Sequence, residues 1–249
     1  MKHLQVAEQA AREAGALLRQ HFGREKHVDE AAHHDIKLAL DREAQELITR
    51  VLLDAFPGHA IYGEEGLAGD LDSPHQWIVD PIDGTVNYLH DIPHFCISIA
   101  LREEEELALG LIFDPMLDEL WTVARGGPAC LNGRTISVSS RAALEESILF
   151  IGCGKDEEGL RIGLPRFQRA SLRARKMRLM GSAALGMAYV ATGRLDAYIE
   201  SRISLWDVAA GQLLVETAGG KVDLDPHPSE PDTYSIVATN GRLPIHEIL

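Results

Sequence analysis

The front of the chain carries apolar side chains at helical spacing in two stretches. The first covers residues 6–22 and stops at Gly23, and the second covers residues 41–56 and stops at Pro57 and Gly58. In each stretch the apolar positions recur every three or four residues, which places them on one face of a helix. We therefore expect two amphipathic helices that pack antiparallel against each other.

The pattern then changes to short apolar runs rich in β-branched and aromatic residues, which are typical of strands. These runs cover residues 60–62, 76–79, 95–101, 107–113 and 119–124. The last three are separated by short turn-like segments, so they predict an antiparallel meander. Consecutive glutamates at residues 103–106 form one of the turns, and such crowded like charges favour a solvated tip over a binding site.

From Ser147 onward, strand and helix patterns alternate. The predicted strands are 148–151, 176–179, 195–199 and 221–224. The predicted helices are 158–170, 182–192 and 205–217, with Ser182 as the N-cap of the second. No internal repeat or Pro/Ser-rich linker interrupts the chain. We expect a single domain over residues 1–249, with an α+β half up to about residue 145 and an α/β half from about residue 146.

The charge balance narrows the classes of partner. The chain has 249 residues, of which 24 are Lys or Arg and 38 are Asp or Glu, so its formal net charge is −14. Nucleic-acid binding needs clustered cations, and this balance argues against a nucleic-acid partner. It is compatible with a small phosphorylated substrate, because bound metal ions can supply positive charge.

The cysteines and the N-terminus bear on the compartment. The three cysteines, Cys96, Cys130 and Cys153, are an odd number in a long chain, so we expect buried or inert thiols in a reducing cytosol. The first residues lack the basic and apolar regions of a signal peptide. No apolar run approaches the roughly 18–20 residues that span a bilayer. We expect a soluble, cytoplasmic protein that does not enter a membrane.

The run WIVDPIDGT at residues 77–85 holds the strongest chemical signal. An apolar strand leads directly into Asp80 and Asp83, and a Gly-Thr pair with free backbone N–H groups follows. Two aspartates on a tight turn can share one Mg²⁺ or bridge two, and the carbonyl of Ile82 can add a neutral ligand. An ordinary strand-to-turn segment is the alternative, because Asp, Pro and Gly are common there. A metal site and an anion site at one strand end point to phosphate chemistry.

Three further segments have both a structural and a chemical interpretation. Glu64, in YGEEG, belongs to a surface turn or is a ligand, and Asp207, in LWDVAAG, is an N-cap or a ligand. The small residues of MGSAAL at 180–185 begin a helix, whose free N–H groups suit an anionic or hydroxylated ligand. The metal interpretation gains weight because the four acids, including Asp80 and Asp83, come from three separate strand or helix ends.

The segment HHDIKLALD at residues 33–41 is less informative. His33 and His34 are adjacent rather than at metal-ligand spacing, so we expect a surface loop. Asp41 is either the N-cap of the second helix or a partner for a catalytic hydroxyl, and the sequence leaves both open. No signature of a Ser-His-Asp triad, a Walker loop or a Gly-rich dinucleotide fingerprint is present.

In their order along the chain, these motifs resemble those of the inositol monophosphatase family, within the superfamily of Mg²⁺-dependent, lithium-sensitive phosphatases. The matching segments are GEE at 63–65, WIVDPIDGT at 77–85, GSAA at 181–184, ATGRLDAY at 191–198 and WDVAAG at 206–211. The similarity extends over nearly the whole chain. It implies a layered αβαβα sandwich of the inositol monophosphatase and fructose-1,6-bisphosphatase type. It also implies a site with two or three Mg²⁺ ions, and a homodimer.

The resemblance implies roles for individual residues as well. Glu64, Asp80 and the Ile82 carbonyl match ligands of the first metal ion. Asp80, Asp83 and Asp207 match ligands of the second. A third, weaker ion would rely on Glu64 and on water.

The remaining implied roles concern water, phosphate and the alcohol. Glu64 and Thr85 match residues that hold and activate the attacking water, and Asp41 matches an aspartate that orients the Thr85 hydroxyl. The phosphate would lie on the backbone N–H groups of Gly84 and Thr85. The substrate hydroxyls would meet residues from several segments, namely Asp83, Gly181, Ser182, Ala183, Glu200 and Asp207. Two cations would clamp the attacking and leaving oxygens, and the phosphoryl group would pass directly to water.

The implied activity is hydrolysis of myo-inositol monophosphate or a related polyol or sugar phosphate. Fructose-1,6-bisphosphatase, histidinol-phosphatase and phosphoadenosine-phosphate phosphatase activities are alternatives, and Arg178 or Arg202 could supply the cation that a second phosphate would want. A regulatory protein that binds metal and phosphate is a further alternative. The chain departs from the family at the front, where Glu30 and Ala31 stand in a region that often holds a Lys. This departure leaves open whether the third metal ion has the same surroundings as in the family. Lys37 is a candidate to replace the charge of the missing Lys.

Overall fold

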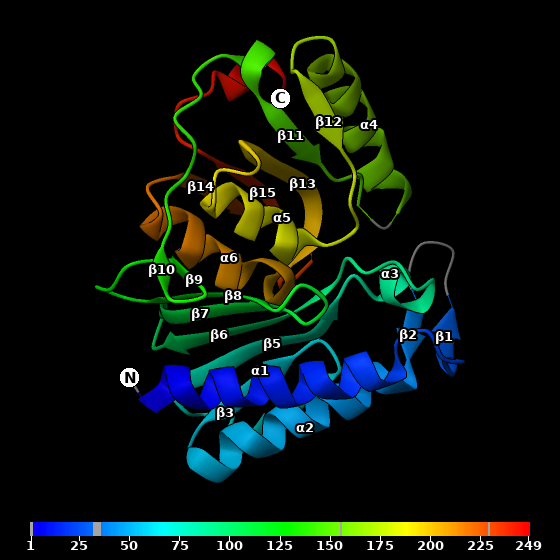
Figure 1. Ribbon diagram of the computed structural model, residues 1–249, viewed down its shortest axis with the longest axis vertical. Coiled ribbons are helices and arrows are strands. Elements are labelled where there is room, and N and C mark those ends of the chain that lie inside the picture. The colour runs from blue at the N-terminus through cyan, green and yellow to red at the C-terminus, as the bar shows by residue number, and fades with distance from the viewer. Residues whose placement is uncertain (1, 32–35, 155, 229) are drawn as a thin grey trace.

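The computed structural model of the chain describes residues 2–31, 36–154, 156–228 and 230–249. His33 and His34, for which the sequence predicts a surface loop, lie outside these residues. The described elements form five layers that alternate between helices and sheets (Figure 1). Within the described residues, no helix combines the length and the apolar character needed to cross a membrane.

The first layer consists of α1 (Lys2–His21) and α2 (Ala39–Ala55), which pack against each other as their patterns predict. α1 buries a stripe of alanines that ends with Leu18, and α2 buries Ile48 and Leu52 among other side chains. Small side chains let the two helices approach closely, while the larger aliphatic groups remove apolar area from water. The pair covers one face of the first sheet.

The second layer is an eight-stranded sheet with the strand order β10-β9-β8-β7-β6-β5-β3-β4. Its strands are β3 (Ala60–Gly63), β4 (Gly66–Gly69), β5 (His75–Asp83), β6 (Cys96–Glu103), β7 (Glu106–Asp114), β8 (Glu119–Ala124), β9 (Cys130–Leu131) and β10 (Arg134–Thr135). β6, β7 and β8 form the predicted antiparallel meander, whereas β3 runs parallel to β5. The central strands are apolar on both sides because helices cover both faces of the sheet.

Helices α5 (Ala183–Ala191) and α6 (Leu205–Thr217) form the third layer, between the two sheets. Both are apolar around most of their circumference, as expected for helices that are buried on all sides. Gly110 of β7 allows a close approach of α6, because a Cβ at this position would lie 2.7 Å from the carbonyl oxygen of Ala210. The first sheet and α6 therefore meet backbone to backbone here.

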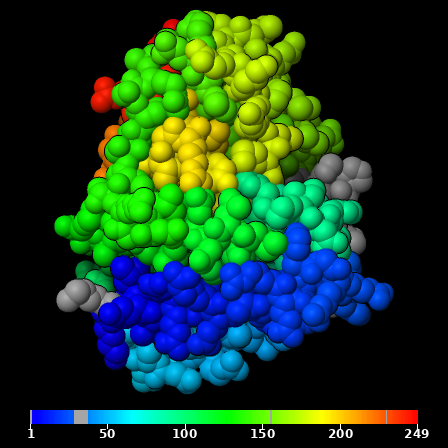
Figure 2. Space-filling model, viewed as in Figure 1, coloured from blue at the N-terminus to red at the C-terminus, as the bar shows by residue number. Residues whose placement is uncertain are grey.

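The fourth layer is a five-stranded sheet with the order β12-β11-β13-β15-β14. Its strands are β11 (Ile148–Ile151), β12 (Lys176–Arg178), β13 (Ala197–Ser204), β14 (Lys221–Pro226) and β15 (Thr233–Thr239). Helix α4 (Glu157–Ser171) packs on this sheet and forms the fifth layer. The predicted αβαβα sandwich is confirmed, and Figure 2 shows the same layers in the packed molecule, with α1 and α2 in blue and cyan at one end.

The structure also contains elements that the apolar pattern does not predict. They are α3 (Thr85–Leu89), β1 (Val28–Ala31), β2 (Ile36–Leu38), β4, β9, β10 and β15, together with the 3₁₀ turns Leu144–Glu146 and Ile245–Glu247. Most of these are too short to show a period. β15 is longer, but it follows a Pro-containing polar segment that by itself indicates a loop. It inserts antiparallel between β13 and β14 and completes the second sheet.

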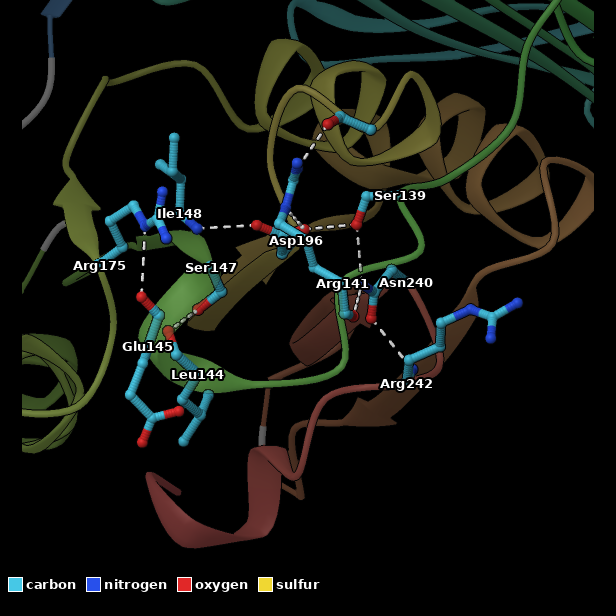
Figure 3. A network of polar contacts seen from close by, with 11 residues as sticks. Ser139, Arg141, Leu144, Glu145, Ser147, Ile148, Arg175, Asp196, Asn240 and Arg242 are labelled. Atoms are coloured by element: carbon cyan, nitrogen blue, oxygen red, sulfur yellow. Dashed lines mark hydrogen bonds and ion pairs between the residues drawn. The ribbon is translucent and has the colours of Figure 1, made fainter.

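A buried aspartate fixes the connection between the two sheets (Figure 3). Asp196, in the ATGRLDAY motif, is fully buried. Its carboxylate accepts hydrogen bonds from Arg141 Nε at 2.7 Å and from the N–H of Ile148 at 2.8 Å. Ser139 Oγ donates to the same carboxylate, and Asn240 Nδ2 donates to Ser139 Oγ at 2.9 Å. This motif therefore ties the segment between the sheets to β13.

Candidate active site

The two aspartates of the WIVDPIDGT run lie where β5 becomes irregular. Asp80 is paired with Ser98 of β6 and Asp83 with Cys96, so β5 has one residue more than its neighbour in this interval. Such a bulge re-aims side chains at the end of a strand, and both carboxylates line one cleft. Asp80 also accepts a hydrogen bond from the N–H of Ile82 at 2.9 Å, which fixes the turn.

Asp80, Asp83 and Asp207 form the centre of the site. One carboxylate oxygen of each lies within 4.8 Å of those of the other two. The three residues are between 1% and 6% exposed. Burial, and then the charges of Glu64 and the other two aspartates, raises the pKa of Asp80 well above its usual value. Burial and the charge of Asp207 raise the pKa of Asp83 to about 7, although hydrogen bonds from α5 oppose this shift.

This three-aspartate cluster fits a hard divalent cation. Its buried carboxylates repel one another, and none of the described side chains that line the cleft belongs to Lys, Arg or His. A bound cation would neutralise the cluster and favour the ionised carboxylates. Carboxylate oxygens are also the ligands that Mg²⁺ prefers. The donor set is therefore that of a site for a hard divalent cation.

The first turn of α5 holds Asp83 in place. The N–H of Ala184 donates to Oδ2 at 2.7 Å and the N–H of Ala183 to Oδ1 at 3.2 Å. The Ser182 hydroxyl donates to Oδ2 at 2.6 Å. Ser182 Oγ also accepts from the N–H of Leu185 at 3.3 Å, which confirms Ser182 as the N-cap. The GSAA motif thus orients one carboxylate of the cluster.

Asp207 and Asp41 each occupy the third position of a helix rather than its N-cap. In α6 the N-cap is Ser204, whose N–H donates to Asp207 Oδ2 at 3.0 Å. In α2 the N-cap is Leu38, whose N–H donates to Asp41 Oδ2 at 2.6 Å. The N-cap interpretation of either aspartate is therefore wrong, because a residue three positions earlier takes that place. Each carboxylate still stabilises its helix start, with one of its two oxygens.

Thr85 lies between Asp41 and the turn after β5. Its hydroxyl is 2.9 Å from the carbonyl oxygen of Ile82 and 3.5 Å from Asp41 Oδ1. One hydroxyl hydrogen serves mainly one acceptor, so the shorter contact with Ile82 dominates in this state. The preceding Gly84 has a φ of 104°, in the left-handed region that favours glycine. A Cβ there would lie 3.1 Å from the carbonyl oxygen of His94.

Glu64 follows β3 and lines the cleft from another side. Its N–H donates to the carbonyl oxygen of Val79 at 3.1 Å, which joins it to β5. The neighbouring Glu65 does not line the cleft, and its N–H donates to Gln45 Oε1 at 2.9 Å. Glu64 is not part of the three-aspartate cluster, but its negative charge contributes to the raised pKa of Asp80.

Glu200 of β13 stands in the wall that the α/β half contributes. The N–H of Gly154 donates to its Oε1 at 2.9 Å, and the Tyr198 hydroxyl donates to its Oε2. A Cβ at Gly152 would lie 2.1 Å from the carboxylate carbon of Glu200, so this glycine makes room for the side chain. Apolar side chains complete the wall, namely Phe150, Leu160, Leu179 and Ile203.

The cleft has a volume of about 370 Å³ and brings together nearly all of the predicted site residues. Those that line it are Glu64, Asp80, Ile82, Asp83, Gly84, Thr85, Gly181, Ser182, Ala183, Glu200 and Asp207. Asp41 does not line the cleft and contacts Thr85 instead. These residues come from both halves of the chain, so the site is formed only when the two sheets are in place.

The sequence left open whether Arg178 or Arg202 supplies a cation to this region. Neither Arg178 nor Arg202 lines the cleft, so neither is placed to meet a second phosphate there. Arg202 instead pairs with carboxylates outside the cleft. All three cysteines are free thiols. Cys96 is buried, whereas Cys130 and Cys153 are partly exposed and Cys153 lines the cleft.

Some residues that shape the site carry only a weak sequence signal. Asn87 lies just beyond the WIVDPIDGT run, and its Nδ2 donates to the carbonyl oxygens of His94 and Met180, each at 2.8 Å. It thereby joins α3 to the segment between β12 and α5, which contains Gly181. Tyr198 lies inside the ATGRLDAY motif two residues before Glu200, so the two side chains share one face of β13 and are in contact.

Comparison with known proteins agrees with this geometry. The sequence model of the inositol monophosphatase family matches residues 2–247. An inositol-1-monophosphatase of Mesorhizobium japonicum is 40% identical over 244 residues, which cover 95% of this chain and 91% of that protein. A fructose-1,6-bisphosphatase/inositol-1-monophosphatase of Thermotoga maritima is 38% identical over 245 residues, which cover 98% of this chain and 93% of that protein.

The fold comparison leads to the same group. The crystal structure of the extragenic suppressor protein SuhB from Bartonella henselae matches with a TM-score of 0.90 and 34% identity. The match covers 97% of this chain and 95% of that one. The chain belongs to the inositol monophosphatase family and is a phosphoric monoester hydrolase.

Proposed function

We propose that this phosphatase hydrolyses myo-inositol monophosphate, or a closely related polyol monophosphate, in a Mg²⁺-dependent and lithium-sensitive reaction. The observation that carries the proposal is the cluster of Asp80, Asp83 and Asp207, whose carboxylate oxygens converge within 4.8 Å in a buried cleft. Glu200 lies in the same cleft and offers a fixed acceptor for a substrate hydroxyl. Two of the relatives carry inositol-1-monophosphatase in their names, which supports this choice of alcohol.

The metal ligands in this proposal are the three aspartates, Glu64 and the carbonyl oxygen of Ile82. We propose two Mg²⁺ ions, with a third that relies on Glu64 and water. When bound, the ions supply positive charge to the attacking and leaving oxygens and lower the pKa of water. Ile82 O now accepts the Thr85 hydroxyl, and a cation on this oxygen would make it a weaker acceptor and favour Asp41 Oδ1, which is 3.5 Å from the same hydroxyl. Metal binding and orientation of Thr85 would therefore be coupled.

Glu64 and Thr85 then hold the attacking water. The water donates a hydrogen bond to Thr85 Oγ1, and the Thr85 hydroxyl donates one to Asp41, whose Oδ2 stays fixed by the N–H of Leu38. Glu64, at the edge of the same cleft, accepts the one proton that the water loses. The phosphate lies on the N–H groups of Gly84 and Thr85, and the water attacks it in line with the leaving alcohol. The bond between phosphorus and the alcohol oxygen breaks, that oxygen takes up a proton from solvent, and the remaining hydrogen of the water leaves with the phosphate.

The alcohol faces the wall that contains Glu200. Its hydroxyls donate to Glu200, which Tyr198 and Gly154 hold in one orientation. Ser182 already donates to Asp83 and accepts from α5, so it acts on the substrate mainly by fixing that carboxylate. Gly181, Ala183 and the carboxylates of the cluster offer further contacts with the hydroxyls.

We also propose that the protein is cytoplasmic and forms a homodimer. Size-exclusion chromatography with light scattering would test the dimer.

Phosphate release from a substrate panel tests the proposal. The panel contains myo-inositol 1-phosphate, fructose 1,6-bisphosphate, histidinol phosphate and phosphoadenosine phosphate, each with Mg²⁺ and with or without Li⁺. We expect the highest kcat/KM for inositol phosphate and inhibition by Li⁺. Arg178 and Arg202 lie outside the cleft lining, which disfavours the two bisphosphates. A higher kcat/KM for another member of the panel would replace the proposed substrate with that one.

A further inference from the structure

Arg202 has an unusual backbone position in β13. The strand pairs Ser201 with Ser235 and Ile203 with Tyr234, so Arg202 is the extra residue of a β-bulge. Its φ is 63°, in the left-handed region that favours glycine. Such strain persists only where the surrounding structure holds the residue in place, and it is found preferentially near functional sites.

The bulge shapes the wall of the cleft. In a regular strand, side chains two residues apart share a face. With one extra residue, Glu200 and Ile203, which are three apart, both line the cleft, whereas Arg202 does not. The conformation of Arg202 therefore decides which side chains of β13 meet the substrate.

The guanidinium of Arg202 joins Asp156, at the start of α4, to Glu230, which lies between β14 and β15. Its Nε donates to Asp156 Oδ2 at 2.6 Å, and its Nη2 donates to both carboxylate oxygens of Glu230 at 2.6 and 2.7 Å. Nη1 lies 3.2 Å from Glu158 Oε2 and 3.1 Å from His227 Nε2. The side chain is only 15% exposed. A planar, multiply bonded guanidinium of this kind fixes geometry as well as charge.

Asp156 links the Arg202 guanidinium to residues that line the cleft. It is the N-cap of α4 and accepts from the N–H of Gly159 at 2.7 Å. Gly154, two residues earlier, donates its N–H to Glu200, and Leu160 lines the cleft. A Cβ at Gly154 would lie 3.0 Å from the Cα of Gly159, so these two glycines are packed tightly against each other. A shift of Asp156 would move this wall.

We propose that Arg202 is a positioning residue. It fixes the part of the cleft wall that faces the leaving alcohol, which contains Glu200 and Leu160, and thereby determines the affinity for a polyol phosphate. The inference rests on the proposed function, in which Glu200 accepts a hydrogen bond from a substrate hydroxyl. Loss of the guanidinium frees the connection before α4, so Gly154 and Glu200 move relative to the phosphate site. The three aspartates stay in place, because β5 and α6 carry them.

Arg202→Gly separates this role from a merely structural one. Glycine adopts the left-handed φ without strain, so the melting temperature is expected to change little while every contact of the guanidinium is lost. We expect KM for myo-inositol 1-phosphate to rise at least about tenfold, with kcat within about twofold. KM for p-nitrophenyl phosphate, which has no hydroxyl for Glu200, is expected to stay unchanged.

Two further variants calibrate the measurement. Asp156→Asn keeps an N-cap acceptor but removes one charge from the clamp, so a smaller rise in the same KM is expected. Arg161→Ala is the matched control, because Arg161 lies on α4 and, among the described residues, pairs with the exposed Glu157. This variant is expected to leave both KM values unchanged.

Amide hydrogen exchange gives a readout that does not depend on turnover. In Arg202→Gly the amides of Gly154 and Leu160 are expected to exchange at least about tenfold faster, while the amides of α6 do not change. Unchanged exchange together with an unchanged KM would overturn the role of Arg202. If the wild-type protein does not hydrolyse inositol phosphate at all, the proposed function fails. The exchange rates then still decide whether Arg202 holds the connection.

Discussion

The acidic cluster makes the metal-free protein less stable as pH rises. Burial and Asp207 raise the pKa of Asp83 in the folded chain to about 7, against 3.8 for an ordinary aspartate. The folded state then binds this proton more tightly than the unfolded state does. The resulting stability is complete below about pH 4 and is lost progressively up to about pH 7. At about 1.4 kcal/mol per pKa unit, the loss amounts to about 4 kcal/mol.

Asp83→Asn removes this titrating group and leaves Asp80, whose pKa is also raised, in place. The amide oxygen can take the place of Oδ2 and keep the hydrogen bonds from Ser182 and Ala184, while the bond from Ala183 is lost at a cost of about 1 kcal/mol. We therefore expect the metal-free variant to be about 1 kcal/mol less stable than the wild type near pH 4. Near pH 8 it is expected to be about 3 kcal/mol more stable. The two stability curves should cross.

Urea denaturation in EDTA, repeated in steps between pH 4 and pH 8, measures these curves. Excess Mg²⁺ at pH 8 should raise the stability of the wild type more than that of Asp83→Asn, which has lost a carboxylate ligand. Asp118→Asn is the control, because this aspartate lies in an exposed turn and its side chain is 70% exposed. The reasoning fails if the free energy of unfolding of the wild type does not fall relative to that of Asp83→Asn as pH rises. Folding would then not raise the pKa of Asp83.

Three further substitutions test other parts of the site and the fold. Asp80→Asn keeps an acceptor for the N–H of Ile82 but removes a shared ligand, so phosphate release should fall to background without a drop in melting temperature. Glu200→Gln should raise KM for inositol phosphate about tenfold and leave that for p-nitrophenyl phosphate unchanged, and a uniform effect would argue against substrate contact. Asp196→Ala leaves the Arg141 guanidinium without its buried partner, and urea denaturation should show a loss of about 3–5 kcal/mol. A loss below about 1 kcal/mol would contradict the structural role of Asp196.

The parts of the site that follow a strand end could be predicted from the sequence. Asp80 and Asp83 are close in the chain, and an apolar strand leads into them, so their convergence needs no long-range information. The long helices and strands were also predictable, because they carry clear periods, whereas their arrangement in layers was implied by the resemblance to the family. Asp41 and Asp207 were assigned to helix starts correctly, but not to the right position. The pattern does not distinguish an N-cap from the third residue of the helix.

The far wall of the cleft depends on contacts that the sequence does not reveal. Glu200 is held by Tyr198 and by Gly154, which lies 46 residues away along the chain. The bulge at Arg202 arises from its pairing with β15, a strand that the pattern does not predict. The role of Arg202 as a clamp, rather than as a phosphate-binding cation, follows only from where its partners lie in space.

Release of inorganic phosphate from myo-inositol 1-phosphate, measured first in Mg²⁺ and then in EDTA, is the most direct test of the three-aspartate site. We expect saturable turnover in Mg²⁺, loss of turnover in EDTA, and recovery when Mg²⁺ is added back. Asp80→Asn should remain inactive in all three conditions. Turnover that persists in EDTA, or that survives the Asp80 substitution, would contradict a metal-dependent phosphatase site at these aspartates.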